Sequence, residues 1–526
     1  MPSLSEETDG RVERLMPGAT IGIIGGGQLG RMMALSARYM GFRIGVLDPT
    51  PDCPTAQVAD FQIAAEYDDI NAIRELAERS DVLTYEFENV DADAIDQVRA
   101  LAAAPQGTDL LRVTQDRVNE KRFINDHGTE TAPWKAVNSF EELDAALDEI
   151  HYPAVLKTRS GGYDGHGQTV LRSEADLEKV RARGDRGGGF PPSILEGFVD
   201  FAFEASILVA GNGKDYVTFP IVRNEHRNNI LHMTIAPAEV SDEVACEAHE
   251  LALRLAEGFT LAGILAIELF VTKDGRVVVN ELAPRPHNSG HYTIEACSFD
   301  QFDAHIRGIA GWPLEQPRLL KPAVMVNVLG QHVAPTRALI ADHPEWNMHD
   351  YCKAEVRHDR KMGHITVLTD DTAETVASGI DRLLERLEES LKFEPMSEHI
   401  VRQTRQKDAI REALSGNDEF ISAQDLHRKL EDEGVHIGLA TVYRQLNALV
   451  ESGRADTVRL DGQQLYRLCG DDGHHHHLVC TSCGKTVEID PPSEDWLRGI
   501  AEKHGFTIES HTVEVFGLCP DCRHRR

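Results

Sequence analysis

The chain of 526 residues is long enough for three or four domains of ordinary size. Its 41% hydrophobic and 27% charged residues are typical of proteins with buried cores, and no run approaches the ~20 apolar residues of a membrane span. The net charge of −32 argues against a protein that coats nucleic acid, and the acidic residues 1–10 lack the pattern of a signal peptide, so we expect a cytoplasmic protein.

The first elements alternate between strand and helix. Strands are expected at 21–24, 43–47, 61–65 and 82–85, and helices at 31–40 and 70–78. This alternation predicts a doubly wound α/β domain over residues 17–113.

A glycine-rich turn follows the first strand. Gly25, Gly27 and Gly30 have the spacing G-x-G-x-x-G, and Asp48 lies about 20 residues further on, which satisfies the pattern of a dinucleotide site. The spacing itself means only that backbone N–H groups and a helix N-terminus face an anionic group. A dinucleotide, the phosphate of another substrate and a plain tight turn all remain open here.

The next region, 114–314, is rich in short strands and carries a second glycine-rich loop. Strands are expected at 154–157, 169–171, 193–196, 204–209, 265–271 and 276–281. Lys157 starts the loop 157–167, and such a loop can lie over phosphates. Glu268 lies in one strand and Asn280 and Glu281 close the next, a set of oxygen ligands that suits Mg²⁺. Each feature alone could be a surface turn or a solvated acid, but their ordered combination predicts a magnesium–phosphate site and decides against the dinucleotide.

A smaller strand-rich piece at 322–369 and a charged amphipathic helix at 372–391 form the expected domain 315–392. A short joint, 392–397, contains Pro395 and Met396. Because Met396 is a residue at which a separate protein could start, two adjacent genes read as one are an alternative to a true fusion.

Residues 19–391 resemble the ATP-grasp enzymes, and specifically the 5-(carboxyamino)imidazole ribonucleotide synthases of purine biosynthesis. The segments that carry the likeness are 26–32, 85–90, 115–121, 161–168, 230–238, 280–291 and 353–364. The resemblance implies a doubly wound N-terminal domain, an ATP-grasp domain and a small β-rich subdomain. It also implies that ATP and Mg²⁺ activate bicarbonate as carboxyphosphate, after which the amine of 5-aminoimidazole ribonucleotide is carboxylated. Another ATP-grasp ligase, such as a formate-dependent transformylase, is the alternative.

The resemblance also assigns site residues. ATP would be held by Arg117, Lys157, Gly162, Gly165, Gly167, Gln168, Glu196, Val199, Glu204, His226, Asn280 and Glu281. Mg²⁺ would be held by Glu268 and Glu281. The ribonucleotide or bicarbonate would meet Gln28, Tyr163, Asp164, Arg285, Lys353 and Arg360. His166 stands where the family often has Arg or Lys, which weakens any role given to that position. Since carboxyphosphate is unstable in water, the loop would have to close over it.

The composition changes after the joint. Helices are expected at 404–414, 423–433 and 439–451, with Ser422 and Gly438 as boundary residues. A hairpin of strands at 457–460 and 464–468 would turn at 461–462. Three helices and a two-stranded wing predict a winged helix over 397–470.

Metal-ligand residues crowd the end of the chain, where five of nine cysteines lie in the last 58 residues. Four of them form two C-x-x-C pairs, Cys480 with Cys483 and Cys519 with Cys522, the ligand set of a structural zinc. The histidine run 474–477 is internal and therefore no affinity tag. If it is extended, alternate side chains face opposite ways, so that His475 and His477 serve one site and His474 and His476 another.

Residues 398–523 resemble the ferric-uptake-regulator family, and most closely its zinc-responsive members, through 404–406, 422–427, 438–446 and 475–484. The resemblance implies a dimeric, operator-binding repressor with a zinc-binding dimerisation domain at 471–526. A structural zinc would bind Cys480, Cys483, Cys519 and Cys522; a regulatory zinc would bind Asp456, Cys469, His475 and His477; a third would bind His474, His476, Glu494 and His511. DNA would contact Arg405, Thr441, Tyr443 and Arg444, although Tyr443 could instead pack against the core.

The sensed metal and the role of this module leave alternatives open. Iron or manganese sensing and a purely structural zinc module are both possible, but the thiolate of Cys469 favours zinc. Residues 397–526 hold 16 basic and 22 acidic side chains, a net −6, which leaves −26 for the remainder. The overall charge therefore describes the enzyme-like part, and no sequence feature indicates coupling between the two.

Overall fold

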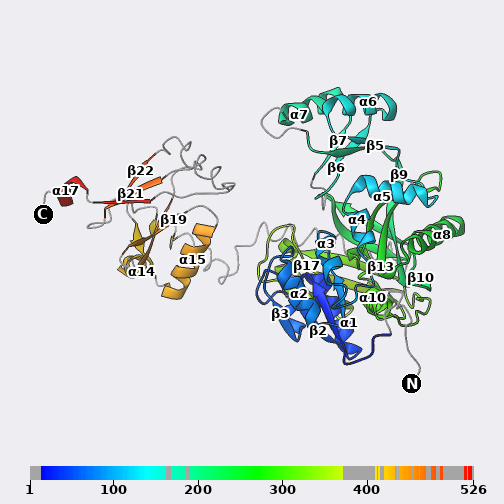
Figure 1. Ribbon diagram of the computed structural model, residues 1–526, viewed down its shortest axis with the longest axis horizontal. Helices are drawn as coiled ribbons and strands as arrows, with labels where there is room; N and C mark the ends of the chain where they lie inside the picture. The colour runs from blue at the N-terminus through cyan, green and yellow to red at the C-terminus, as the bar shows by residue number, and fades with distance from the viewer. Residues whose placement is uncertain are drawn as a thin grey trace, which may run out of the picture. The chain divides into compact units, whose positions relative to one another are not determined.

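The computed structural model describes residues 14–161, 167–184, 190–370 and parts of 409–523. The chain divides into two compact units, Met1–Lys392 and Phe393–Arg526, both drawn in Figure 1. The amphipathic helix predicted at 372–391 lies outside the described residues. Among the helices in the described ranges, none is both long and apolar enough to cross a membrane.

The first unit begins with a parallel four-stranded sheet in the order β3-β2-β1-β4. Its elements are β1 (Thr20–Ile24), α1 (Gln28–Tyr39), β2 (Arg43–Leu47), β3 (Phe61–Ile63), α2 (Ile70–Glu78), β4 (Val82–Tyr85) and α3 (Ala92–Val98). The strands are apolar at nearly every position because both faces are covered. Residues of α1 pack on one face and residues of α2 and α3 on the other, which confirms the doubly wound prediction.

The glycine-rich turn binds carboxylates of the protein itself. The N–H groups of Gly27 and Gly30 donate to the two oxygens of Glu86, and the N–H of Gly26 donates to Asp48 at 2.8 Å. A Cβ at Gly25, where φ is +107°, would lie 2.3 Å from the Glu86 side chain. The anionic group that the spacing predicts is therefore internal, and the loop serves as a tight turn.

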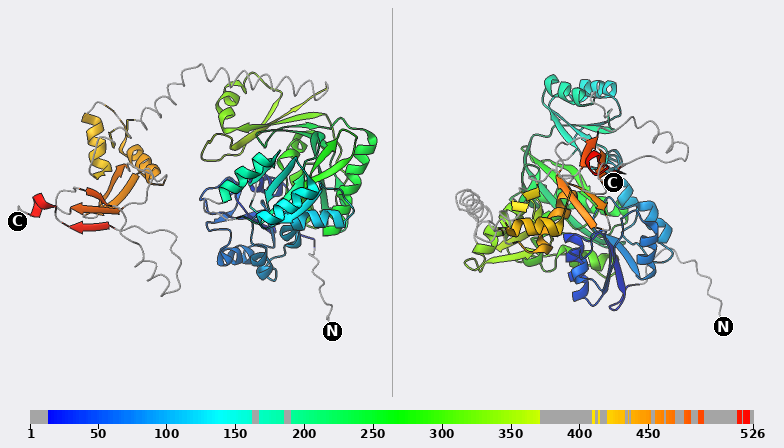
Figure 2. Two further views of the ribbon diagram at one scale, coloured as in Figure 1. Left: turned by 90° about the horizontal axis from the view of Figure 1, so that it is seen from above. Right: turned by 90° about the vertical axis from the view of Figure 1, so that its left-hand side faces the viewer.

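The chain next forms a small antiparallel sheet in the order β5-β8-β6-β7, which stands out from the rest of the unit with its two helices (Figures 1 and 2). Its elements, with the two helices that precede it, are α4 (Asp109–Thr114), α5 (Arg117–Asp126), β5 (Trp134–Val137), α6 (Phe140–Ile150), β6 (Ala154–Thr158), β7 (Gln168–Leu171), α7 (Glu174–Gly184) and β8 (Ser193–Gly197). The predicted strands at 154–157, 169–171 and 193–196 are confirmed as β6, β7 and β8.

A nine-stranded sheet completes the unit, in the order β14-β13-β9-β11-β12-β15-β17-β16 with β10 beside β9. Its strands are β9 (Phe201–Asn212), β10 (Tyr216–Thr218), β11 (Val222–Arg227), β12 (Ile230–Ala236), β13 (Ala262–Thr272), β14 (Val277–Ala283), β15 (Ala323–Leu329), β16 (Trp346–Asp350) and β17 (Lys361–Leu368). The helices are α8 (Asp242–Phe259), α9 (Thr293–Ala296), α10 (Gln301–Ile309) and α11 (Val333–Leu339). Since β15 pairs with β12, the strand-rich piece after residue 322 extends the nine-stranded sheet rather than forming a sheet of its own.

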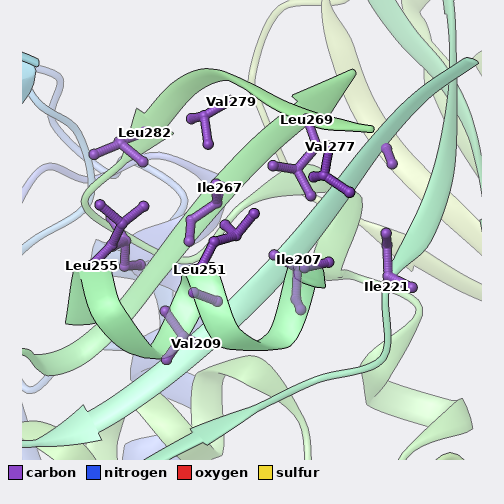
Figure 3. Packing of buried hydrophobic residues seen from close by; sticks show 14 of the residues in the cluster. Ile207, Val209, Ile221, Leu251, Leu255, Ile267, Leu269, Val277, Val279 and Leu282 are labelled. Carbon is purple, nitrogen blue, oxygen red and sulfur yellow. The ribbon is translucent and has the colours of Figure 1, made fainter. Parts of the chain in front are cut away.

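The main core lies between α8 and the strands that carry the site. Leu251 and Leu255 of α8 face Ile207, Ile267 and Val279 on β9, β13 and β14, as Figure 3 shows. All five side chains are at most 1% exposed, so each contributes about 2 kcal/mol of apolar burial. This packing holds β13 and β14 in place as the base for the polar residues that they carry.

The second unit holds two small sheets. The first has the order β18-β20-β19 and the second the order β22-β21-β23, in which β21 and β23 are parallel. The elements are β18 (Ile421–Ser422), α14 (Ala423–Asp432), α15 (Leu439–Glu451), β19 (Ala455–Leu460), β20 (Gln463–Leu468), β21 (His476–Cys480), β22 (Thr486–Ile489), β23 (Glu514–Gly517) and α17 (Pro520–Arg523). Residues 409–410 and 413–414 are helical, and β19 pairs with β20 as the predicted hairpin. The winged helix is confirmed.

Candidate functional site

A cavity of about 950 Å³ lies in the first unit. Its wall includes the carboxyl ends of β4 and β14, the middle of β13 and the loop 353–361. Of the predicted site residues, those on the wall are Gln28, Arg117, Glu268, Glu281, Arg285, Lys353 and Arg360. Residues separated by more than three hundred positions in the sequence therefore share one cavity.

Two carboxylates face each other across the ladder of β13 and β14. Glu268 and Glu281 are register partners on the paired strands β13 and β14. Glu281 accepts a hydrogen bond from Arg117 Nη1 at 2.8 Å, and Glu268 Oε1 lies 3.2 Å from His287 Nε2. Burial raises the pKa of Glu268, but the hydrogen bond from His287 and the charges of His287 and His226 outweigh it, and the net shift is downward. Two carboxylates side by side are a donor set that fits Mg²⁺.

The guanidinium of Arg117 is held beside these carboxylates. Burial lowers the pKa of Arg117, but Glu281 and Glu120 outweigh it and raise the pKa above its usual range. Glu120 is itself 2% exposed and accepts from the N–H of Leu282 at 2.7 Å. Burial, together with the charge of Glu281, raises the pKa of Glu120 to about 8.

A buried network of two lysines and one carboxylate lies next to the cavity. Lys157 Nζ is 2.9 Å from Glu196 Oε2 and 3.4 Å from Asn280 Oδ1. Lys121 Nζ donates to the carbonyl of Asn280 at 2.6 Å and lies 3.5 Å from Glu196 Oε1. Burial raises the pKa of Glu196, but the two lysines outweigh it and lower the pKa to about 2. The network joins β6, β8, α5 and β14 beside the carboxylate pair.

The pKa of Glu196 predicts a pH dependence of stability. The pKa of Glu196 is about 2 in the folded protein and about 4.3 in an unfolded chain. The charged carboxylate therefore contributes fully to the free energy of unfolding above about pH 5, and this contribution is lost as the pH falls toward 2. The difference in free energy of unfolding between wild type and Glu196→Gln should therefore be constant above pH 5 and should shrink below it. Urea unfolding across this range measures it. Exposed Glu247→Gln is the control, and a difference independent of pH would contradict the assignment.

Three cations predicted to meet the ribonucleotide or bicarbonate line the cavity. Arg285 Nε donates to Glu88 at 2.9 Å. Lys353 Nζ donates to the carbonyl of Lys361 at 2.8 Å, and Arg360 Nη1 donates to that of Glu355 at 3.1 Å. Burial lowers the pKa of Arg285, but Glu88 outweighs it and raises the pKa, so the guanidinium stays charged.

Other predicted residues lie elsewhere. Lys157, Gly167, Gln168, Glu196, Val199, Glu204, His226 and Asn280 are described but do not line this cavity. Among them, Glu204 Oε2 and His226 Nδ1 are 2.5 Å apart on β9 and β11. Gly162, Tyr163, Asp164, Gly165 and His166 lie outside the described residues.

Several polar residues of the site escaped the prediction. Glu120 and Lys121 stand in a segment that carries the family resemblance, yet their burial is invisible in the sequence. Asn288 lines the cavity and is 8% exposed, and neither atom of its amide has a partner among the described residues. An unpaired buried group costs about 1–3 kcal/mol, so this amide is suited to hydrogen-bond a ligand in the cavity. The only local signal is its position between His287 and the glycine at 290.

In the second unit, three of the four predicted cysteine ligands come together. One ligand atom each from Cys480, Cys519 and Cys522 lies within 4.8 Å of the others. The N–H of Cys519 also approaches Cys480 Sγ at 3.3 Å. Three thiols this close fit a tetrahedral zinc site, and Cys483, the fourth predicted ligand, lies outside the described residues.

Only some of the other residues predicted to bind metal or DNA in this unit are among the described residues. Asp456 lies in β19, His476 and His477 lie in β21, and Thr441 and Arg444 lie in α15. Tyr443 is half-buried and packs against the core of the unit, in line with the packing alternative. Arg405, Cys469, His474, His475, Glu494 and His511 lie outside the described residues.

Family models match four consecutive parts of the chain. They are the ribonucleotide synthetase preATP-grasp domain at 18–115, the ATP-grasp domain at 122–302, the phosphoribosylaminoimidazole carboxylase C-terminal domain at 323–378 and the ferric uptake regulator family at 398–516. The order of these matches is the order that the two resemblances predict.

Relatives of high identity cover the first unit. The N5-carboxyaminoimidazole ribonucleotide synthase of Bacillus subtilis (strain 168) is 48% identical over 359 residues, which are 67% of this chain and 92% of that protein. The enzyme of the same name from Staphylococcus aureus (strain MRSA252) is 43% identical over 69% of this chain and 96% of its own.

Solved structures of synthases of this kind also match this chain. An N5-carboxyaminoimidazole ribonucleotide synthetase in complex with ADP is 46% identical, with a TM-score of 0.69 over 72% of this chain and 100% of that one. The Aspergillus clavatus synthase in complex with ADP and 5-aminoimidazole ribonucleotide is 30% identical, with a TM-score of 0.64 over 70% and 99%. The chain therefore belongs to the N5-carboxyaminoimidazole ribonucleotide synthase family of ATP-grasp ligases and carries a ferric uptake regulator family domain after its enzyme part.

Proposed function

We propose that the first unit carboxylates the amine of 5-aminoimidazole ribonucleotide, using ATP and bicarbonate. The observation that carries the proposal is the cavity in which the facing carboxylates Glu268 and Glu281 lie on the same wall as the cations Arg285, Lys353 and Arg360. A metal–phosphate site and an anion-binding site are thus combined, as the union of ATP with a phosphorylated substrate requires. The names of the relatives support the same substrate.

Each group has a task in this reaction. Glu268 and Glu281 would hold Mg²⁺, which when bound neutralises charge on the ATP phosphates. Arg117 and Lys157 would add fixed positive charge for the transferred phosphoryl group, with Glu196 holding Lys157 in place. Arg285, Lys353 and Arg360 would bind the ribonucleotide phosphate or bicarbonate. The amide of Asn288 would offer these ligands a donor and an acceptor.

The bond changes balance without a further reactant. Bicarbonate oxygen attacks the γ-phosphorus and ADP leaves, which gives carboxyphosphate. The amine nitrogen then bonds to the carboxyl carbon, either directly or after CO₂ is released, while phosphate leaves and the amine loses a proton. Because the intermediate is unstable in water, the site would have to limit the access of water during this sequence.

A kinetic assay of the full chain tests this function. ADP should be released only when ATP, Mg²⁺, bicarbonate and 5-aminoimidazole ribonucleotide are all present, and omission of the ribonucleotide should reduce the rate to background. Formate is the control substrate, because a transformylase would use it in place of bicarbonate. ADP release that needs formate, or that ignores the ribonucleotide, would contradict the proposal.

For the second unit, we propose a zinc-responsive DNA-binding regulator that acts as a dimer. The observation that carries it is the cysteine cluster beside a winged helix. Cys480, Cys519 and Cys522, with Cys483, would hold the structural zinc, while Asp456 and Cys469 would join His475 and His477 in the regulatory site. Selection from a random DNA pool with zinc tests this proposal. Failure to enrich any sequence would favour a purely structural zinc module.

A further inference from the structure

A buried chain of hydrogen bonds runs behind the cavity. His305 Nδ1 accepts from the N–H of Ile264 at 3.2 Å, and His305 Nε2 lies 2.9 Å from Thr84 Oγ1. The hydroxyl of Thr84 donates to Gln106 Oε1 at 2.7 Å, and Gln106 Nε2 donates to the carbonyl of Pro284 at 2.5 Å. The three side chains are at most 4% exposed. We call these five residues the buried hydrogen-bond chain.

The direction of every bond in the chain is determined from both ends. The amide of Ile264 can only donate, so Nδ1 of His305 must accept and Nε2 must carry the proton. The carbonyl of Pro284 can only accept, so the NH₂ of Gln106 faces it and Oε1 faces Thr84. The two arguments meet at Thr84, whose oxygen accepts from His305 while its proton goes to Gln106.

Two glycines allow α10, the helix that carries His305, to lie close to β13 and β9. A Cβ at Gly263, where φ is +105°, would lie 2.9 Å from His305 Nδ1. A Cβ at Gly308 of α10 would lie 2.3 Å from the carbonyl of Gly211. Burial lowers the pKa of His305 to about 3, in agreement with the neutral ring that the hydrogen bonds require.

The chain ends next to an ion pair on the cavity wall. Pro284 directly precedes Arg285, and Thr84 lies on β4, the strand that leads into Glu88. Arg285 and Glu88 meet at 2.9 Å in the cavity. The buried hydrogen-bond chain thus ties together the two segments whose ends form this pair, although they belong to different sheets.

We propose that the buried hydrogen-bond chain positions Arg285 for the anionic substrate, so that Thr84, Gln106 and His305 are positioning residues. This inference rests on the proposed function of the first unit. Loss of the Thr84 hydroxyl leaves His305 Nε2 and Gln106 Oε1 unpaired. Gln106 can then shift together with the Pro284 carbonyl that it holds, which moves the backbone of Arg285. Glu268, Glu281 and the lysine network have hydrogen-bond and ion-pair partners that are not members of the chain, so the binding of ATP should be little affected.

The test replaces Thr84 with valine, which keeps the shape and removes the hydroxyl. For Thr84→Val, KM for 5-aminoimidazole ribonucleotide should rise about tenfold, while KM for ATP should stay within about twofold of wild type. Thr84→Ser should restore wild-type values. Thr218→Val is the matched control, because Thr218 is 4% exposed and its hydroxyl lies 2.5 Å from His249 Nδ1, away from the cavity. It should lower the melting temperature without changing either KM.

Two results would overturn the inference. One is a Thr84→Val enzyme that is destabilised like Thr218→Val but keeps its KM for the ribonucleotide. The other is an equal rise in both KM values, which would indicate a general structural role. A wild-type chain with no ribonucleotide-dependent activity would instead refute the proposed function. In that case a crystal structure of Thr84→Val tests the positioning role without an activity assay. If the distance between Arg285 and Glu88 stays at 2.9 Å, the positioning role is rejected.

Discussion

Replacing Glu281 with glutamine should lower the ribonucleotide-dependent release of ADP by about 10²–10³-fold. The change removes the charge of one of the two carboxylates that face each other on β13 and β14, and it removes the ionic partner of Arg117. Glutamine keeps an oxygen acceptor and the volume of the side chain, so the fold should survive. Steady-state kinetics at saturating Mg²⁺ measure the effect, and the melting temperature verifies folding.

Glu257→Gln is the matched control for this experiment. Glu257 is exposed on α8, in the same unit, and the substitution changes charge by the same amount. Its rate should equal that of wild type. An unchanged rate in Glu281→Gln would show that this carboxylate takes no part in the reaction. The central argument for a magnesium site would then fail.

Replacing Cys480 with alanine should remove about one zinc ion per chain and abolish zinc-dependent DNA binding. Cys480 is buried at the end of β21, where it meets the thiols of α17 and the residue before it. Because a structural zinc contributes folding energy outright, its loss should unfold the local sheet. Metal analysis and gel shifts with the enriched DNA, with and without a chelator, measure both effects.

Cys246→Ala is the control, since Cys246 is an exposed cysteine on α8 of the first unit. It should change neither zinc content nor DNA binding. Cys469→Ala separates the two roles of zinc, because it should weaken the response to zinc while the structural ion stays bound. DNA binding by Cys480→Ala that survives chelation would refute a zinc-dependent regulator.

Local signals allowed much of the fold to be predicted. Helix α2 spans the predicted 70–78 because Asp69 accepts from the N–H groups of Asn71 and Ala72 and so fixes its start. Strands β4 and β2 have the predicted bounds because their apolar runs are short and sharply flanked. In the second unit, Ser422 accepts from the N–H of Asp425 and starts α14 as its residue type suggests.

Long-range pairing could not be predicted in the same way. Nothing near the glycine turn shows that Glu86, 56 residues after Gly30, supplies the anion that the turn binds. Nor does the spacing of β15 show that it joins β12 in the larger sheet. The strand pattern singled out Glu268 and Glu281, whereas the register of the two strands, which makes them neighbours, required the structure.

Burial is the other property that the sequence hid. Lys121 and Glu120 look like ordinary surface residues of an amphipathic helix, but both are at most 2% exposed and take part in the charge network of the site. The contact between Thr84 and His305 joins positions 221 residues apart, beyond any local pattern. The net charge of the chain is informative only when the two parts are counted separately. Residues 1–396 carry −26 and residues 397–526 carry −6.

The central claim is that the first unit transfers the carbon of bicarbonate to a ribonucleotide amine. The most direct measurement incubates the full chain with ATP, Mg²⁺, 5-aminoimidazole ribonucleotide and ¹³C-bicarbonate and follows the label by NMR. The label should appear as a carboxylate on the exocyclic nitrogen of the ribonucleotide, with one ADP and one phosphate formed for each labelled product. Label that stays in bicarbonate while ATP is consumed, or a product formed only from formate, would contradict the claim.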